Sequence, residues 1–138
     1  FYTSHHLLRN GAIEVVGVAG PEPEYDDATL SRVASETRKN LAEVRKLVFE
    51  LASAMSSAFR VGSARLENTD QSIWLEATCN GFVVVLGKKN ESYWGGIRRA
   101  GAETFVTWTN SNATAIEAVS KIAAGAKAVG LAECLAQA

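Results

Sequence analysis

The chain has 138 residues, with 14 basic and 15 acidic side chains and a formal net charge of -1. This length suits one domain with a modest core, and the balanced charge excludes a general attraction to nucleic acid or to an anionic membrane. The longest apolar run, Phe82 to Leu86, is far shorter than the about 20 residues that a membrane-spanning helix needs. We therefore expect one soluble globular domain over residues 1–138, with no membrane span.

The two cysteines, Cys79 and Cys134, are too few for a disulfide framework. We expect both to be buried or idle thiols in a reducing compartment, which favours a cytoplasmic location. The first residues, FYTSHHLLRN, lack the basic start and the continuous apolar block of a signal peptide. Because the chain begins with Phe1, both a processed product and a fragment of a longer protein are open interpretations.

Residues 1–20 are expected to form a β-hairpin. An extended FYTSHHLL is followed by a turn at residues 9–11 and then by AIEVVGV, and Asn10-Gly11 supplies the positive backbone dihedrals that a tight turn needs. His5 and His6 suggest a metal site, but neighbouring strand residues point to opposite faces and do not converge on one ion. We predict no metal and no cofactor.

The longest predicted element is an amphipathic helix over residues 27–59. Its apolar residues recur at alternating spacings of four and three, and three further ones widen the stripe, as is typical of a helix that covers a sheet. At about 1.5 Å per residue, an unbroken helix would be about 50 Å long, which exceeds the width of a small domain. Either it bends near residues 38–40 or one end projects into a partner. The stripe comprises Leu30, Ala34, Thr37, Leu41, Val44, Val48, Leu51, Met55 and Ala58, widened by Val33, Leu47 and Ala54.

Three segments after this helix have strand character: SARLENT, SIWLEATC and FVVVLGK, with turns near residues 70–71 and at Asn80-Gly81. In the second segment, apolar residues alternate with Trp74, Glu76 and Thr78, which predicts one covered and one exposed face. The apolar run FVVVL is expected to be covered on both faces, by this chain or by a partner.

Residues 91–109, ESYWGGIRRAGAETFVTWT, fit two structures, because TFVTW alone has strand character whereas the whole segment also has helical spacing. We expect a helix. Gly95-Gly96 beside Arg98-Arg99 suggests an anion cradle, but the glycine spacing and the Gly-Lys-Ser/Thr ending of a P-loop are missing. Close packing of the helix on the sheet is the favoured interpretation. The proposed helical face consists of Tyr93, Ile97, Ala100, Thr104 and Trp108, with Ser92 as the cap.

Residues 110–138 are expected to add an alanine-rich C-terminal helix that begins at Thr114, where Thr114 and Glu117 have capping-box spacing. The fold class that follows is α+β, with a mainly antiparallel five-stranded sheet covered by the long helix. The expected order along the chain is β-β-α-β-β-β-α-α. The apolar stripe of the last helix comprises Ile116, Val119, Ala123, Ala126 and Val129.

The sequence contains no recognisable catalytic set. The histidines are adjacent near the start of the chain, no glycine-flanked serine elbow occurs, and the two cysteines are far apart with no spaced metal ligands between them. Glu76 is the one acid in a well-defined strand, and its alternation predicts a solvated position rather than a general base. We therefore predict that the protein is not an enzyme.

One local cluster combines cations with aromatic residues: Lys88, Lys89, Tyr93, Trp94, Arg98 and Arg99. Stacking aromatics within a basic stripe are typical of nucleic-acid binding, but nothing extends this patch and the chain as a whole is not basic. The same residue types are enriched at protein interfaces. We favour a protein partner and expect no nucleic acid.

The order of elements, together with the stretch ENTDQSIWLEATCNGFVVVLGKKNESYWGGIRRAGAETFV, resembles the roadblock/dynein light chain family of the roadblock/longin group. The family's polar strand, short turn, apolar strand and glycine-containing loop are similar to Ser72–Thr78, Asn80-Gly81, Phe82–Leu86 and Asn90–Gly96, and the resemblance covers residues 1 to about 109. Family members usually begin with a helix, whereas this chain begins in a strand and adds a helix at residues 110–138. That departure leaves a profilin-like or other α+β sandwich open.

The resemblance implies a non-catalytic dimeric scaffold or regulatory platform, a homodimer or a heterodimer of related chains that binds a small GTPase or a motor or signalling complex. We expect Leu41, Val44, Val48 and Leu51 to form the core or the dimer contact. The partner surface is expected at Trp74, Tyr93, Trp94, Arg98 and Arg99. The alternatives are a small-molecule-binding domain or small enzyme with a pocket between sheet and helices, and a subunit of a larger assembly.

Overall fold

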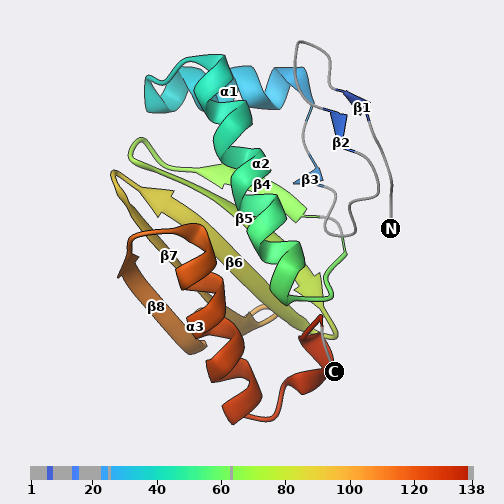
Figure 1. Ribbon diagram of the computed structural model, residues 1–138. Coiled ribbons are helices and arrows are strands. Elements are labelled where there is room, and N and C mark those ends of the chain that lie inside the picture. The colour runs from blue at the N-terminus through green and yellow to red at the C-terminus, as the bar shows by residue number, and fades with distance from the viewer. Residues whose placement is uncertain (1–5, 8–13, 16–22, 25, 63, 137–138) are drawn as a thin grey trace.

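The computed structural model describes residues 6–7, 14–15, 23–24, 26–62 and 64–136. Its centre is a six-stranded sheet in the order β3-β4-β5-β6-β7-β8, in which β4 to β8 form an antiparallel meander and β3 pairs parallel with β4 (Figure 1). The predicted α+β class with a mainly antiparallel sheet is confirmed. The strands are β3 (Pro23–Glu24), β4 (Ala64–Asn68), β5 (Ser72–Cys79), β6 (Phe82–Lys89), β7 (Ser92–Arg99) and β8 (Phe105–Asn112).

Tight turns fix the register of the meander. Asn80 and Gly81 join β5 to β6 with φ of 48° and 82°, and Asn90, with φ of 56°, begins the turn between β6 and β7. Such positive angles suit Asn and Gly, and the twist of these turns matches the twist of the flanking strands. Each of these turns therefore places eight residues of one strand opposite eight of the next.

The prediction of a helix over residues 91–109 is wrong, because this segment forms β7 and most of β8. Tyr93, Gly95 and Ile97 face the helices, whereas Trp94 and Arg98 face the other side, so the segment has a period of two. The helical spacing seen in the sequence loses to the strand because β7 pairs with β6 along its whole length. The hairpin of β7 and β8 also changes the element order, because five antiparallel strands, and not three, follow the helical segment of residues 27–58.

The long helical segment is broken near residues 38–40, so the bend, and not the projecting end, is the alternative that the structure adopts. The segment forms α1 (Asp27–Thr37) and α2 (Leu41–Ala58), separated by Arg38, which adopts φ of 60° in the left-handed region. Asn40 caps α2 by accepting a hydrogen bond from the Glu43 N–H, and the Glu43 carboxylate accepts one from the Asn40 N–H. This reciprocal capping box starts a new helix and turns the chain.

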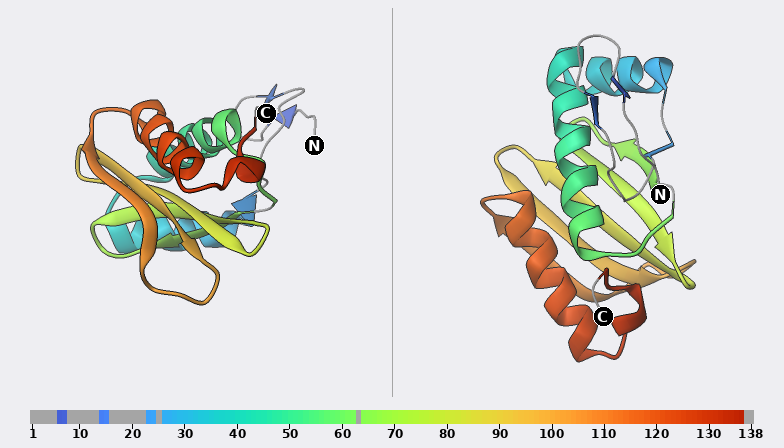
Figure 2. Two further views of the ribbon diagram at one scale, coloured as in Figure 1. Left: turned by 90° about the horizontal axis from the view of Figure 1, so that it is seen from below. Right: turned by 45° about the vertical axis from the view of Figure 1, so that its right-hand side comes forward.

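Helices α2 and α3 (Ala115–Ala128) lie side by side on one face of the sheet (Figures 1 and 2). The core between them and the sheet includes Val48, Leu51, Leu75, Leu86 and Ile122. Helix α1 packs against α2 and β4.

Thr114 caps helix α3, as its spacing to Glu117 predicted, because the Thr114 hydroxyl accepts a hydrogen bond from the Glu117 N–H. The apolar stripe of α3 was only partly predicted, since Ile116 is 56% exposed and Ile122 is buried. Gly125 lies directly over the Thr107 side chain, where an added Cβ would come within 2.1 Å of the hydroxyl oxygen. A glycine at this point allows α3 to lie close to β8.

The described part of the N-terminal segment pairs β1 (His6–Leu7) antiparallel with β2 (Glu14–Val15), which agrees with the predicted hairpin. These strands form a sheet of their own and are not part of the main sheet, so the expected five-stranded sheet is built from other strands. The expected turn at residues 9–11 and the His5 position lie outside the described residues.

After α3 the chain returns to the residues at the end of α2. A short 3-10 helix, η1 (Ala132–Cys134), follows, and Leu135 forms an isolated bridge with Phe59. Cys79 and Cys134 are both buried and free, and the Cys134 thiol donates a hydrogen bond to the Cys79 carbonyl oxygen at 3.5 Å. Among the described helices, none has both the length and the hydrophobicity that a membrane crossing requires.

Candidate binding surface

The sheet face opposite α2 and α3 carries a grid of side chains that we call the tryptophan face. It can be derived from strand alternation, because residues that alternate with the core positions of β5 to β8 share this face. Residue pairing across the strands arranges them in rows. The tryptophan face comprises Trp74, Glu76 and Thr78 of β5, Val83, Val85, Gly87 and Lys89 of β6, Trp94, Gly96 and Arg98 of β7, and Phe105 and Trp108 of β8.

Four aromatic rings form a continuous chain across this face. The ring centroids of Trp74 and Trp94 are 5.6 Å apart, those of Trp94 and Trp108 are 5.5 Å apart, and those of Trp108 and Phe105 are 4.8 Å apart. All three pairs are tilted, an arrangement that aromatic rings prefer over face-to-face stacking. Residues from three different strands thereby form one aromatic surface.

Two glycines make room for these rings. In the paired strands Gly87 stands between Trp74 and Trp94, and a Cβ there would lie 2.5 Å from the Trp74 Cβ and 2.7 Å from the Trp94 ring. On β7, a Cβ at Gly96 would lie 2.7 Å from the Phe105 ring and 3.1 Å from the Trp108 ring. The indoles therefore lean inward over the small residues at the centre of the sheet instead of pointing straight outward.

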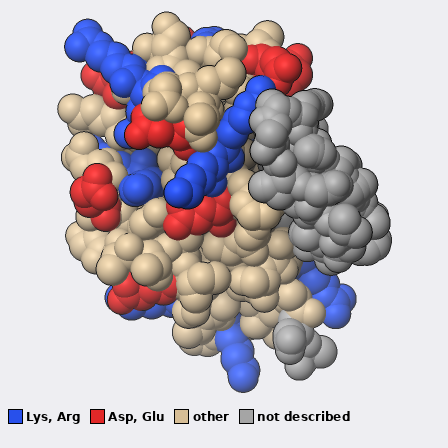
Figure 3. Space-filling model, turned by 45° about the horizontal axis from the view of Figure 1, so that its top comes forward, with Lys and Arg blue, Asp and Glu red and all other residues tan. Residues whose placement is uncertain are grey.

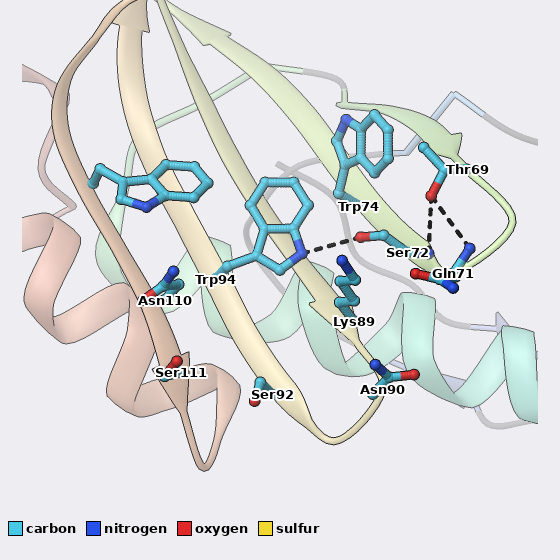
Figure 4. A pocket seen from close by; sticks show the side chains of 11 residues that line it. Thr69, Gln71, Ser72, Trp74, Lys89, Asn90, Ser92, Trp94, Asn110 and Ser111 are labelled. Carbon is cyan, nitrogen blue, oxygen red and sulfur yellow. Dashed lines mark hydrogen bonds between the residues drawn. The ribbon is translucent and has the colours of Figure 1, made fainter.

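Hydrogen bonds orient two of the three indoles. The Trp74 Nε1–H donates to the Glu76 carboxylate at 2.8 Å. The Trp94 Nε1–H donates to the Ser72 hydroxyl at 3.1 Å (Figure 4). Glu76 also forms an ion pair with Arg98 at 3.6 Å. Trp108 is different, because it is 49% exposed and its indole N–H has no acceptor among the described residues.

A groove of about 580 Å³ lies at the end of the tryptophan face that is bounded by the β4–β5 and β6–β7 turns (Figure 4). This volume is within the range of about 300 to 1,000 Å³ that is usual for ligand pockets. Three indoles contribute the apolar surface, and hydroxyl and amide side chains contribute the polar surface. The groove is lined by Thr69, Gln71, Ser72, Trp74, Lys89, Asn90, Ser92, Trp94, Trp108, Asn110 and Ser111.

Among the described residues that line the groove, Lys89 is the single charged one. Elsewhere the charges are mixed. Over α1 and α2, basic and acidic side chains alternate, with ion pairs between Arg32 and Glu36 at 3.1 Å and between Arg45 and Asp27 at 2.8 Å (Figure 3). Within the described residues, no three His, Cys, Asp or Glu side chains are grouped so that they could hold a metal ion.

The structure separates the residues that were expected at a partner surface. Trp74, Trp94 and Arg98 lie together on the tryptophan face, but Tyr93 points to the opposite face, where it is only 6% exposed. The Tyr93 hydroxyl donates to the Glu50 carboxylate of α2 at 2.9 Å. Burial, reinforced by this carboxylate, raises the pKa of Tyr93 to about 12.

The cluster of cations is separated in the same way. Arg99 pairs with Phe82 on the neighbouring strand and lies over its ring at 5.0 Å, and Lys88 lies 5.2 Å from the Tyr93 ring centroid. Strand alternation therefore puts Lys88 and Arg99 on the helix side of the sheet and Lys89 and Arg98 on the tryptophan side. The four cations are close in sequence, but they do not form one basic surface in the folded protein.

The residues expected to form the core or a dimer contact lie inside this chain. Val44, Val48 and Leu51 are fully buried on the side of α2 that packs into the core, and Leu41, at the start of α2, is partly buried against the same core. A side chain that is already covered by its own chain has no free surface for a second chain.

Sequence reasoning missed Trp108, Phe105 and the polar lining of the groove. Trp108 was placed on a helical face, so its position beside Trp94 did not follow from the sequence. The glycines could have indicated this face. Gly87 and Gly96 stand within strand-like segments, and a glycine inside a strand is usual where another group approaches the backbone closely.

A comparison of this chain with protein-family models, with curated proteins and with solved structures gives no match. The resemblance to the roadblock/dynein light chain family stays a prediction, and the function has to be argued from the chemistry of the tryptophan face.

Proposed function

We propose that this chain is a non-catalytic binding module that holds a partner protein on its tryptophan face. The observation that carries the proposal is the gathering of Trp74, Trp94, Trp108 and Arg98 on the sheet face that α2 and α3 leave uncovered. Trp and Arg are the residue types most enriched among the side chains that dominate the binding energy of protein interfaces.

The chemistry of the groove supports binding rather than catalysis. Its described lining offers hydroxyl, amide, indole and ammonium groups but no carboxylate, imidazole or thiol. A general acid or base and an activated nucleophile usually depend on those missing groups. The hydrogen bonds that fix Trp74 and Trp94 also favour binding, because an interface residue held in place loses less conformational entropy when a partner docks.

A position-dependent crosslinking experiment tests this function. A photo-crosslinking amino acid is placed at Thr78, an exposed position of the tryptophan face, and in a matched variant at Ser120, an exposed position of α3. Each variant is irradiated in an extract of the cells that produce the protein, and adducts are identified by mass spectrometry. We expect one partner to be crosslinked from Thr78 and not from Ser120.

The same adduct should disappear when Trp94→Ala is added to the Thr78 variant, with circular dichroism as the control for folding. An adduct that forms equally from Ser120, or that persists after Trp94→Ala, would contradict binding on the tryptophan face.

A further inference from the structure

The groove at the end of the tryptophan face has a chemistry that identifies one kind of partner segment. We propose that it binds a proline-rich segment in the extended polyproline II conformation, one that carries no basic residue. This inference rests on the proposed function and specifies the part of the partner protein that is recognised.

Hydrogen bonding provides the first argument. A proline residue has a carbonyl oxygen but no N–H, so a proline-rich segment presents acceptors and almost no donors. The groove offers several donors: the indole N–H of Trp108, which has no acceptor among the described residues, the NH2 groups of Gln71, Asn90 and Asn110, and the ammonium group of Lys89. The amide and hydroxyl side chains of the lining accept as well as donate, so they can also pair with one another. The described lining of the groove contains no carboxylate, whose acceptor oxygens would have no partner in such a segment.

The apolar part of the groove provides the second argument. Polyproline II segments dock on grooves lined by aromatic side chains, because the proline rings are apolar and the preformed conformation loses little entropy on binding. Here the indoles of Trp74, Trp94 and Trp108 form the apolar floor, and the hydroxyl and amide side chains lie along it (Figure 4).

The length of the groove agrees with a short segment. It crosses from β5 to β8, which is three steps of about 4.8 Å between neighbouring strands, or about 14 Å. A polyproline II chain rises about 3.1 Å per residue, so four to five residues would span this distance. Such a segment would run across the strands, along the row of indoles.

Charge determines which proline-rich segments fit. Lys89 is the one charged side chain in the described lining; Asp70 and Glu91 stand in the two bounding turns but do not line the groove. A basic ligand residue would be repelled by this ammonium group, whereas an acidic one would be attracted. The preferred segment is therefore neutral or acidic.

Direct titration tests the proposal with three ten-residue peptides: decaproline, decaproline with one central Glu, and decaproline with one central Lys. Binding is followed by tryptophan fluorescence and by calorimetry on the full chain. We expect the Glu peptide to bind best and the Lys peptide worst. In Lys89→Gln this order should disappear, and decaproline binding should weaken less than it does in Trp108→Ala.

Two variants localise the binding. Trp108→Ala should weaken decaproline binding by at least about 10-fold, as is usual when an exposed aromatic anchor is removed. Phe49→Ala is the matched control, because Phe49 is 47% exposed on α2, on the other side of the sheet, and its removal should leave the affinity unchanged.

Three results would overturn the inference: no binding of any of these peptides at millimolar concentration, binding that Trp108→Ala does not change, or tighter binding of a neutral oligosaccharide such as cellohexaose in the same groove. Failure here is distinguishable from failure of the proposed function. If Trp94→Ala still abolishes the Thr78 crosslink while no proline peptide binds, the tryptophan face holds a partner of different chemistry.

Discussion

The hydroxyl of Tyr93 on β7 donates a hydrogen bond to the carboxylate of Glu50 on α2, with 2.9 Å between the hydroxyl oxygen and either carboxylate oxygen. This contact joins the sheet to the helix that covers it, and its two residues are 43 positions apart in the sequence. Because Tyr93 is buried, its neutral form is stabilised in the folded protein, and its pKa is raised from 10.0 to about 12.

The raised pKa of Tyr93 predicts a loss of stability in alkali. The folded protein holds the Tyr93 proton more tightly than the unfolded chain, so the contribution is fully present below pH 10 and is lost as the pH rises towards 12. The free energy involved is on the order of 2 to 3 kcal/mol. Urea denaturation of the wild type and of Tyr93→Phe between pH 8 and 12 measures it.

Tyr93→Phe is expected to show a smaller fall in unfolding free energy over this pH range than the wild type, since it has no phenol to ionise. Equal falls in the two proteins would mean that the Tyr93 hydroxyl is not protected by burial.

Val48 is completely buried on the core side of α2, so Val48→Glu is expected to unfold the protein rather than to split a dimer. An isolated carboxylate in an apolar core has no partner and costs more than about 3 kcal/mol. Circular dichroism during urea denaturation measures the stability, and light scattering measures the mass of any folded fraction.

Lys46→Glu is the matched control, because Lys46 is exposed two positions earlier on the same helix. Its unfolding free energy should stay within about 0.5 kcal/mol of the wild type. A folded, monomeric Val48→Glu protein would instead indicate that Val48 contacts a second chain.

Gly87→Ala is expected to destabilise the protein by about 1 to 3 kcal/mol, the usual cost of overpacking. The added Cβ would lie 2.5 Å from the Trp74 Cβ and 2.8 Å from the Ile73 carbonyl oxygen, so the strands themselves would have to move. The midpoint of thermal unfolding measures this effect.

Gly62→Ala provides the comparison, since the nearest atom to a Cβ at that position is the Thr78 hydroxyl oxygen at 4.0 Å. Its midpoint should be close to that of the wild type. If both alanine variants melted at the same temperature as the wild type, the close approach of the indoles to Gly87 would be refuted.

Asn40→Ala is expected to reduce the unfolding free energy by about 1 kcal/mol, because it removes the side chain that caps α2. Asn40→Ser keeps a capping oxygen and should recover most of the loss. Chemical denaturation of the three proteins checks this order, and an alanine variant as stable as the serine variant would argue against a cap at Asn40.

Local patterns determined a large part of the structure without any tertiary information. Asn80-Gly81 determined a hairpin, Thr114 with Glu117 determined where α3 begins, and the alternation around Trp74 determined which face of β5 is covered. These features depend on neighbouring residues and on backbone dihedrals, so the sequence carries them directly.

The structure of residues 91–109 could not be predicted from local patterns. Helical and strand spacing were both present there, and only pairing with β6 and coverage by α3 select two strands. That choice in turn moves Trp108 beside Trp94 and turns Tyr93 inward to Glu50.

The sequence by itself determined an α+β chain with a long amphipathic helical segment over residues 27–59 and a set of Trp and Arg residues. Only the tertiary structure decided which of those residues share a surface, because sheet registry sets the neighbours of each side chain, and registry depends on contacts between residues far apart in the chain.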